Sequence, residues 1–495
     1  MPISKSDELF ALIKSLTKAE KRNFKIYAQR MSDAEDLLFL QLFEMLDKQK
    51  ELNEEQLYTK FDKSQLPNLK RHLYSQILVS LKLLFSRKRI PIQIREFLDF
   101  ANILYGKGLY KQSLKILDKA NALAEKLQDD VLILHILEHK KIIESRHITR
   151  TGTHNVADLT KHTTKLLSRI DTNLKLSNLR LILHGWYIRR GHVKSAEEAS
   201  EVLEAFNAIK PNIVIEDLGL VDMAYHLQSR VWLNFMLCDF QRTYEYAAQW
   251  VELFKYEKGY INRDMNLLMR GYHYILTSLY NLGDLTKYTQ YLKELEAYRK
   301  DNYKKFNKNS QVISFLYVHN GRLSYYILAK KYDEGIKVIP RTLSRINRYK
   351  ASLDAHRIFV FYFKIAWLHL MAGDPSSSIK YLHKIMHTQM GNLREDIQVY
   401  ARLAFLLAHY DQGNYDLMDY LIRDVKKFIQ KSEHVSTIQD EVLAFFSKLS
   451  KTALNDRKQV FETFLGVMTD LKKDPYEVRG FLYLDIIPWL EKHLQ

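Results

Sequence analysis

The 495-residue sequence has few of the residues that cross-link or sharply turn a chain. Its one cysteine, Cys238, excludes an internal disulfide framework and a thiolate metal cluster within one chain. Glycine (16) and proline (8) are scarce for this length, which disfavours a β-rich fold with many tight turns. No apolar run approaches the ~18 residues that a membrane-spanning helix needs. The polar, partly acidic N-terminus does not resemble a secretory signal, so we expect a cytoplasmic protein with no membrane span.

Blocks of like charge are also missing, because acidic and basic residues alternate almost everywhere. Lys and Arg nevertheless exceed Asp and Glu, and the formal net charge is +17. A positive charge of this size favours attraction to nucleic acid, the ribosome, an anionic lipid surface or an acidic protein. Lysines spread over solvated helix faces would give the same total. The composition therefore leaves a polyanionic partner open.

What the sequence does contain is a recurring turn between two long amphipathic stretches. The turn is usually a glycine with an aromatic or apolar residue two places on, and it returns at intervals of 39 to 47 residues. A period of this length is typical of helical-repeat arrays. The nine turns centre on Gly108, Gly152, Gly191, Cys238, Gly283, Lys330, Gly373, Gly413 and Asn455.

The residues that follow each turn also share a pattern. The clearest copy is Gly108-x-Tyr110-x-x-Ser113-x-x-x-Leu117-x-x-Ala120, with a small residue five places after the glycine. A small side chain there lets the second helix approach its neighbour closely. Tyr288 and Met418 depart from the pattern at this position. The small residues are Ser113, Ala157, Ala196, Thr243, Gly335 and Ser378.

This spacing resembles the second half of a tetratricopeptide (TPR) repeat over about residues 92–472, although the usual Trp and Gly of the first helix are mostly absent. The resemblance implies an all-α fold, with a right-handed α-solenoid of about nine TPR-like helix-turn-helix repeats at 91–473. A small helical domain at 1–90 would precede it, and a capping helix at 474–495 would shield the last repeat. The architecture is loosely similar to bacterial peptide-sensing regulators with TPR-like bodies.

The first 90 residues do not follow the repeat. Capping boxes at Thr17–Glu20 and Asn53–Gln56 indicate helix starts. A long final helix with one apolar and one basic face resembles, in outline, a helix-turn-helix module. A helical cap or a partner-docking domain fits the same residues. The sequence predicts helices at about 5–15, 18–31, 34–48, 54–61 and 67–86.

Motifs that would carry chemistry are sparse. His135-Ile136-Leu137-Glu138-His139 matches an inverted zinc-protease pattern, and Arg402 to His409 has a spacing found in some helical ribonucleases. Both lie within expected repeat helices, where chance pairs are common. There is no glycine-rich phosphate loop and no G-x-S-x-G elbow. We expect no enzyme activity, no cofactor and no metal, with a helical hydrolase as a distant third hypothesis.

The leading hypothesis is a non-catalytic adaptor or regulatory scaffold that binds a protein or peptide on the concave face of the array. In such arrays the first helix of each repeat lines that face, and its polar and aromatic side chains hold the ligand. The predicted groove residues are Arg230, Asn234, Arg270, Tyr274, His319, Asn320, Arg322, Arg357, Tyr362 and Lys364.

The alternative hypothesis is a regulator associated with nucleic acid or the ribosome. It would use the basic end of the helix at 67–86 and the stretch 298–308, where basic and aromatic residues interleave. The predicted polyanion contacts are Lys70, Arg71, Arg87, Lys88, Arg89, Arg299, Lys300, Lys304, Lys305 and Lys308.

Overall fold

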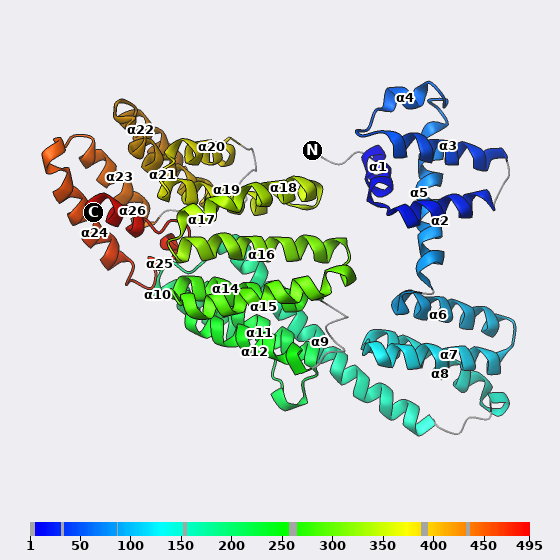
Figure 1. Ribbon diagram of the computed structural model, residues 1–495. Helices are drawn as coiled ribbons and strands as arrows, with labels where there is room; N and C mark the ends of the chain where they lie inside the picture. The colour runs from blue at the N-terminus through cyan, green and yellow to red at the C-terminus, as the bar shows by residue number, and fades with distance from the viewer. Residues whose placement is uncertain are drawn as a thin grey trace. The chain divides into compact units, whose positions relative to one another are not determined.

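The protein is all-helical over the residues described by the computed structural model, which are 5–30, 34–86, 88–151, 156–256, 265–387, 395–431 and 436–495. These residues form α-helices and short 3₁₀ turns and contain no β-strand (Figure 1). The predicted all-α class is confirmed. No helix within these ranges combines the length and the apolar character needed to cross a lipid bilayer.

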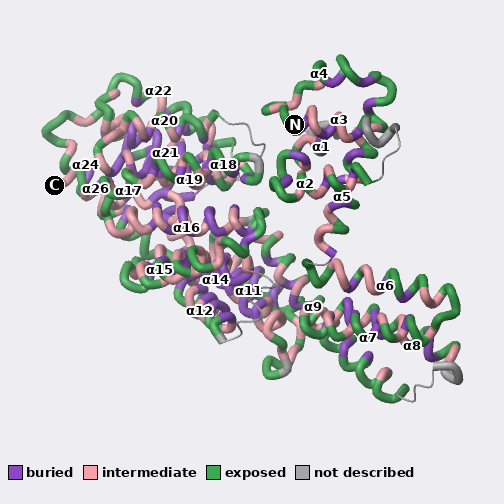
Figure 2. Tube along the Cα trace, turned by 45° about the vertical axis from the view of Figure 1, so that its right-hand side comes forward, coloured by how far each residue is buried: buried purple, intermediate pink, exposed green. Residues whose placement is uncertain are grey.

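The chain divides into two compact units, Met1–Asp171 and Thr172–Gln495. The division falls inside one long helix, α9 (Val156–Arg190). In the first unit, buried apolar residues form one cluster between Leu9 and Ile77 and another between Ile94 and Leu166. Figure 2 marks the buried residues along the chain in purple. The predicted domain limits at residues 90 and 473 stay predictions.

The helices of the first unit follow the predicted pattern closely. All five helices predicted for residues 5–86 are confirmed, with ends shifted by a few residues at most, as helix ends commonly are. The helices of this unit before α9 are α1 (Lys5–Ser15), α2 (Lys18–Gln29), α3 (Ala34–Lys48), α4 (Glu54–Tyr58), α5 (Leu66–Ser86), α6 (Ile90–Gly106), α7 (Tyr110–Leu127) and α8 (Asp130–Thr151).

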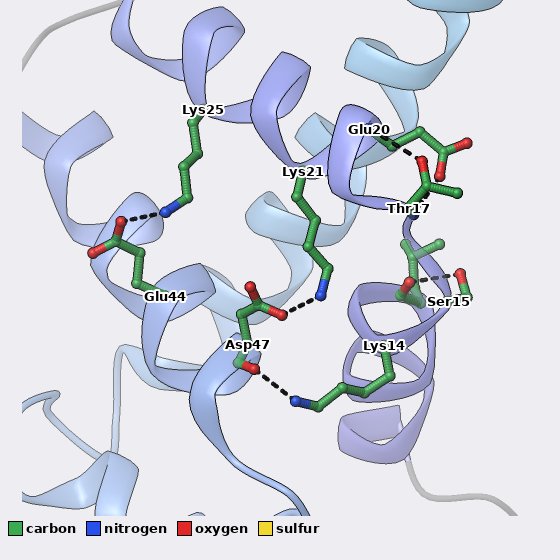
Figure 3. A network of polar contacts seen from close by, with 9 residues as sticks. Lys14, Ser15, Thr17, Glu20, Lys21, Lys25, Glu44 and Asp47 are labelled. Atoms are coloured by element: carbon green, nitrogen blue, oxygen red, sulfur yellow. Dashed lines mark hydrogen bonds and ion pairs between the residues drawn. The ribbon is translucent and has the colours of Figure 1, made fainter.

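The capping box at the start of α2 is confirmed. The hydroxyl of Thr17 accepts a hydrogen bond from the backbone N–H of Glu20 at 3.2 Å, and the Glu20 carboxylate accepts one from the Thr17 N–H at 2.6 Å. Nearby, Lys14 Nζ donates to the carbonyl oxygen of Asp47 at 2.7 Å, and Lys21 pairs with the Asp47 carboxylate (Figure 3). Both α1 and α2 are therefore tied to the end of α3.

The second predicted capping box forms only in half. Asn53 Oδ1 accepts a hydrogen bond from the N–H of Gln56 at 3.2 Å, as expected. The backbone N–H of Asn53 donates to Gln49 Oε1 at 3.2 Å instead of to Gln56. The residue that directly follows α3 thus supplies the acceptor, which the local four-residue pattern does not reveal.

Much of the second unit consists of helical hairpins whose two helices pack on each other, such as α11 with α12, α14 with α15, and α19 with α20 (Figure 1). By contrast, α18 follows α17 after the single residue Val338. The first helices of successive hairpins also pack on one another, α14 on α16, α16 on α19, α19 on α21, and α21 on α23. We call these five the first-helix row. The helices after α9 are α10 (Ala196–Ile209), α11 (Leu220–Met236), α12 (Phe240–Tyr256), α14 (Met265–Leu282), α15 (Leu285–Asn302), α16 (Lys308–Leu328), α17 (Tyr332–Lys337), α18 (Ile339–Tyr349), α19 (Ala355–Met371), α20 (Pro375–Met386), α21 (Glu395–Asp411), α22 (Met418–Ile429), α23 (Thr437–Leu449), α24 (Arg457–Leu471), α25 (Val478–Phe481) and α26 (Ile487–Leu494).

Most of the predicted turns have the backbone conformation that ends a helix. A residue in the left-handed region satisfies the last carbonyls of the helix, and glycine adopts it without strain. Gly152 lies outside the described residues, and Asn455 falls in a 3₁₀ turn at Leu454–Asp456 instead. The turns with positive φ are Gly108 (74°), Gly191 (73°), Cys238 (58°), Gly283 (73°), Lys330 (55°), Gly373 (82°) and Gly413 (78°).

The end of the chain forms two short helices, α25 and α26, where the sequence predicts one capping helix. Pro488 occupies the first turn of α26, where its missing N–H is tolerated, and it could not sit inside a longer helix. α26 packs on α24, and the Trp489 Nε1–H donates to Asp411 Oδ1 at 3.0 Å. The residues between α24 and α26 are therefore not part of the final helix and can run in another direction.

Candidate functional site

A cavity of about 590 Å³ lies in the second unit, between α14, α16, α19 and the C-terminal segment at 472–488. We call it the inner cavity. Its helical walls come from positions four residues apart, which lie on one face of an α-helix. Those positions are His273, Thr277 and Asn281 on α14, Asn320, Ser324 and Leu328 on α16, and His356, Val360 and Lys364 on α19.

The C-terminal segment supplies the remaining wall. Phe481, Tyr483 and Asp485 face the inner cavity. The Tyr483 ring stacks on Tyr400 of α21, with centroids 4.8 Å apart, and Asp485 pairs with Lys472 at 2.6 Å. The chain's own end thus covers part of the helical wall that the sequence predicts to be free. The volume that remains is within the range of about 300–1,000 Å³ typical of ligand pockets.

Lys364 is one of three lysines that line the inner cavity, and the other two, Lys330 and Lys472, pair with Glu491 and Asp485. Lys364 Nζ donates a hydrogen bond to the Ser324 hydroxyl and lies 5.9 Å from the centroid of the Tyr280 ring. No carboxylate among the described residues forms an ion pair with it. Burial lowers the pKa of the Lys364 amine to about 7, because a charged group in a poorly solvated cavity loses hydration. An anion bound next to the amine would raise its pKa, and the side chain would then carry a full positive charge at neutral pH.

His273 lines the inner cavity and is affected by the charges of nearby basic residues. Burial, and then the charges of Lys364, Arg270 and Arg357, lower the pKa of its imidazole to about 3. The ring stacks on Tyr317 with centroids 4.6 Å apart and planes 9° from parallel. His273 is thus neutral at pH 7, and the positive charge around it comes from the lysine and the arginines.

Asn320 contributes an unused hydrogen-bond acceptor. Its side-chain Oδ1 is buried and has no hydrogen-bond partner among the described residues. A buried amide oxygen without a donor costs free energy, of the order of 1–3 kcal/mol, unless a ligand or water supplies one. The inner cavity therefore combines a cation without a carboxylate and an acceptor without a donor.

Of the predicted groove residues, the structure brings two into the inner cavity, Asn320 and Lys364. Arg270 and Arg357 act on it through their charge on His273. Arg357 itself is exposed and pairs with Asp354 at 3.1 Å.

The other predicted groove residues make internal contacts. The Asn234 amide is buried and donates to the carbonyl oxygen of Arg230 at 2.8 Å, and the Arg230 guanidinium lies 5.2 Å from the Phe206 ring centroid. The remaining four pack within the helices: Tyr274 edge-on to Trp232 (5.3 Å), Tyr362 against Tyr381 (5.8 Å), His319 on Thr342 (3.0 Å), and Arg322 on Glu296.

The predicted polyanion contacts near the N-terminus are partly engaged with neighbouring residues. Lys70 pairs with Glu54 at 2.7 Å, and Arg71 makes a long contact of 3.5 Å with Asn68. Arg87 lies outside the described residues. Lys88 is exposed, as is Arg89, whose guanidinium lies 4.4 Å from the Phe85 ring centroid.

The stretch at 298–308 divides in the same way. Arg299 is half-buried, and its Nε donates to Ser314 Oγ at 3.3 Å. The lysines of the stretch are exposed: Lys300, Lys304, Lys305 and Lys308.

The two motifs that could carry chemistry lie on packed helices. The rings of His135 and His139 meet edge to face with centroids 4.9 Å apart, while Glu138 pairs with Lys141. No group of three possible metal ligands occurs in the described ranges. Arg402 packs on the Phe428 ring, with its guanidinium 3.5 Å from the ring centroid, and His409 contacts Asn414 at 2.9 Å.

Sequence reasoning missed several residues of the inner cavity, among them His273, Ser324 and Tyr483. A signal for the first two was present, because His273 and Ser324 each lie four residues from another polar residue, Thr277 on α14 and Asn320 on α16. No comparable signal marks Tyr483, which reaches the cavity only through the path of the C-terminal segment.

No family model, curated protein or solved structure matches this chain. The second unit belongs to the class of all-α structures built largely from helical hairpins, here with a cavity whose walls are polar and aromatic.

Proposed function

We propose that the chain is a non-catalytic binding protein, an adaptor or regulatory scaffold built as a divergent TPR-like solenoid of about nine repeats. Three observations support this. The hairpins of the second unit follow one another in sequence order, the first-helix row is continuous, and seven of the predicted turns are left-handed. Such arrays present the first helices of their repeats to ligands.

The ligand we propose is a peptide segment that carries a carboxylate, held in the inner cavity. The observation that carries the proposal is that Lys364, without a carboxylate partner, and Asn320 Oδ1, without a donor, line the same cavity. A carboxylate would pair with the amine, and a peptide N–H would satisfy the amide oxygen. Aromatic walls from Phe363 and Trp367 suit an apolar side chain beside the carboxylate.

The test begins with a selection from random peptides that end in a free carboxylate. Titration calorimetry then measures the dissociation constant of a selected peptide for the wild type, Lys364→Met and Asn320→Leu. Each lost charge-assisted or buried hydrogen bond should weaken binding roughly tenfold. Lys300→Met, which removes an exposed lysine away from the cavity, serves as the matched control and should bind like the wild type.

A C-terminal amide version of the peptide separates the carboxylate from the rest of the contact. It should bind the wild type roughly tenfold more weakly and show little further loss with Lys364→Met, because the two changes remove the same interaction. Equal loss on both proteins, or equal binding of the acid to wild type and Lys364→Met, would contradict the proposal.

A second candidate function is a nucleic-acid- or ribosome-associated regulator. The exposure of Lys300, Lys304 and Lys305 on one short stretch favours it, since these side chains could reach phosphates. Such a protein should co-purify with material that absorbs at 260 nm, and its retention on nucleic acid should fall steeply as salt rises. The peptide ligand proposed for the inner cavity should withstand the same salt better, because its contacts are partly buried.

A further inference from the structure

His319 of α16 contacts Thr342 of α18, with Nδ1 3.0 Å from Oγ1, and four arginines on α15, α16 and α18 lie close enough for their charges to act on its imidazole. They are Arg299 of α15, Arg322 of α16, and Arg341 and Arg345 of α18, and we call them the arginine cluster. The His319 side chain is 3% exposed. This side of α16 differs from the side that lines the inner cavity, because Asn320 follows His319 and successive helix residues point about 100° apart.

The surrounding packing holds part of the arginine cluster in place. Arg299 donates to Ser314 Oγ at 3.3 Å, and its guanidinium lies 5.5 Å from the Tyr303 ring centroid. The hydroxyls of Tyr303 and Tyr349 lie 3.3 Å apart beside Arg299. Arg322 is fixed by its ion pair with Glu296. A site whose side chains are already oriented loses less conformational entropy when a ligand binds.

The positive charge of the arginine cluster is poorly balanced. Glu296 is the one carboxylate within the described residues that pairs with a member of the cluster, and Arg341 and Arg345 form no ion pair there. The adjacent Asp301 is exposed on α15 and pairs with none of the four. Burial and then the four arginines lower the pKa of His319 to about 3.

We propose that the arginine cluster binds a phosphate dianion, either free or as a phosphate monoester. Guanidinium groups match phosphate oxygens with two parallel N–H donors each, and several of them can share one phosphate. A dianion also relieves the repulsion among the four arginines more than a single carboxylate would.

Titration calorimetry with inorganic phosphate, against chloride at equal ionic strength, tests the site. Arg341→Gln/Arg345→Gln should weaken phosphate binding at least tenfold, because each arginine contributes charge-assisted hydrogen bonds. The matched control, Lys304→Gln/Lys305→Gln, removes the same charge from exposed neighbours and should change the dissociation constant less than twofold. Arg341→Gln alone, at an exposed position, keeps the test valid if the double variant does not fold.

The pKa of the His319 imidazole distinguishes binding at the arginine cluster from non-specific charge attraction, which would leave this pKa unchanged. A phosphate beside the arginine cluster offsets their field, so the pKa of His319 should rise when phosphate binds. Histidine side-chain NMR signals, assigned with His319→Gln, should therefore shift on titration with phosphate. Binding without a change at His319, or an equal loss in the lysine control, would overturn the proposal.

A second arm separates the two sources of the phosphate group. Tighter binding of a phosphoserine peptide than of inorganic phosphate would identify a monoester as the ligand, and equal binding would identify free phosphate as sufficient. If a single-stranded oligonucleotide binds while both small phosphates fail, the arginine cluster is an extended polyanion surface and the proposed site is wrong. If the wild type binds neither the phosphates nor the oligonucleotide, the proposal is likewise wrong.

Discussion

At the scale of single residues, burial governs the chemistry of Lys364. Its amine loses hydration in the inner cavity and gains one hydroxyl contact, from Ser324, in return. With a pKa of about 7 the amine is close to half-charged near neutral pH. A carboxylate ligand would restore the charge, so ligand binding should be coupled to proton uptake.

The depressed pKa of Lys364 predicts a stability that depends on pH. Between about pH 7 and the usual lysine value of about 10.4 the unfolded chain holds a proton that the folded chain has released. Since the unfolded state then binds more protons, this group's contribution to the free energy of unfolding rises with pH over that window. We expect the wild type to gain about 3 kcal/mol relative to Lys364→Met between pH 7 and pH 10.

Urea denaturation at several pH values measures this difference. Lys300→Met changes a solvated lysine, so its difference from the wild type should stay flat across the same range. A flat difference for Lys364→Met as well would show that the Lys364 amine keeps an ordinary pKa.

A second residue-scale prediction concerns a glycine that the repeat pattern singles out as small. A Cβ at Gly335 would lie 2.8 Å from Leu368 Cδ2 and 3.0 Å from Tyr326 Cβ, both in buried or half-buried surroundings. Overpacking of about 1–3 kcal/mol should outweigh the helix preference of alanine, about 1 kcal/mol, and leave Gly335→Ala about 1 kcal/mol less stable. Gly466→Ala, with open space at its Cβ, should gain up to about 1 kcal/mol in the same chemical denaturation.

The sequence could predict Gly335 because the close contact follows from the spacing after a turn. It could not separate Asn320, which faces the inner cavity, from Asn234, which is buried and bonds to its own helix. Both are polar residues on first helices. Which face of each helix is open depends on how neighbouring hairpins and the C-terminal segment pack, and that information is not local.

At the scale of elements, α15 and α16 show how one departure from the repeat pattern is accommodated. Tyr288 stands where the pattern has a small residue, and it is buried against Gly321 of α16. Its hydroxyl donates to the Gly321 carbonyl oxygen at 2.8 Å. Gly321 on α16 thus supplies the small residue that the pattern would place on α15, and the two helices can still approach closely.

Removing the Tyr288 hydroxyl should therefore weaken the contact between α15 and α16. Tyr288→Phe should lower the free energy of unfolding by about 1 kcal/mol, the usual contribution of a buried hydrogen bond. Tyr420→Phe, at a side chain 63% exposed, should stay within about 0.5 kcal/mol of the wild type. Equal stability of Tyr288→Phe and wild type in urea denaturation would mean that the hydroxyl bond adds nothing.

Helices and turns were predictable because each depends on a few neighbouring residues. The left-handed turns at Gly283 and Gly373 and the capping box at Thr17 are such cases. The split of the C-terminal helix into α25 and α26 was missed, although Pro488 marks the start of the second helix. The path of the segment between 472 and 488 over the first-helix row depends on long-range contacts, such as that between Tyr483 and Tyr400.

At the scale of the whole molecule, the chain contains two compact units, each with its own buried clusters of apolar side chains. Cooperative unfolding follows the extent of such clusters, and larger chains commonly unfold in more than one step. We therefore expect differential scanning calorimetry to resolve two transitions, one for each unit.

Two substitutions already motivated by local structure assign these transitions. Thr17→Ala removes the capping box of α2, which should lower the stability of the first unit by about 1 kcal/mol and its midpoint by about 2–4 °C. Gly335→Ala should lower only the midpoint of the second unit, because the contact it disturbs lies there. If both variants shift one shared midpoint, the two units unfold as a single cooperative structure, and a ligand bound in the inner cavity would then also stabilise the N-terminal helices.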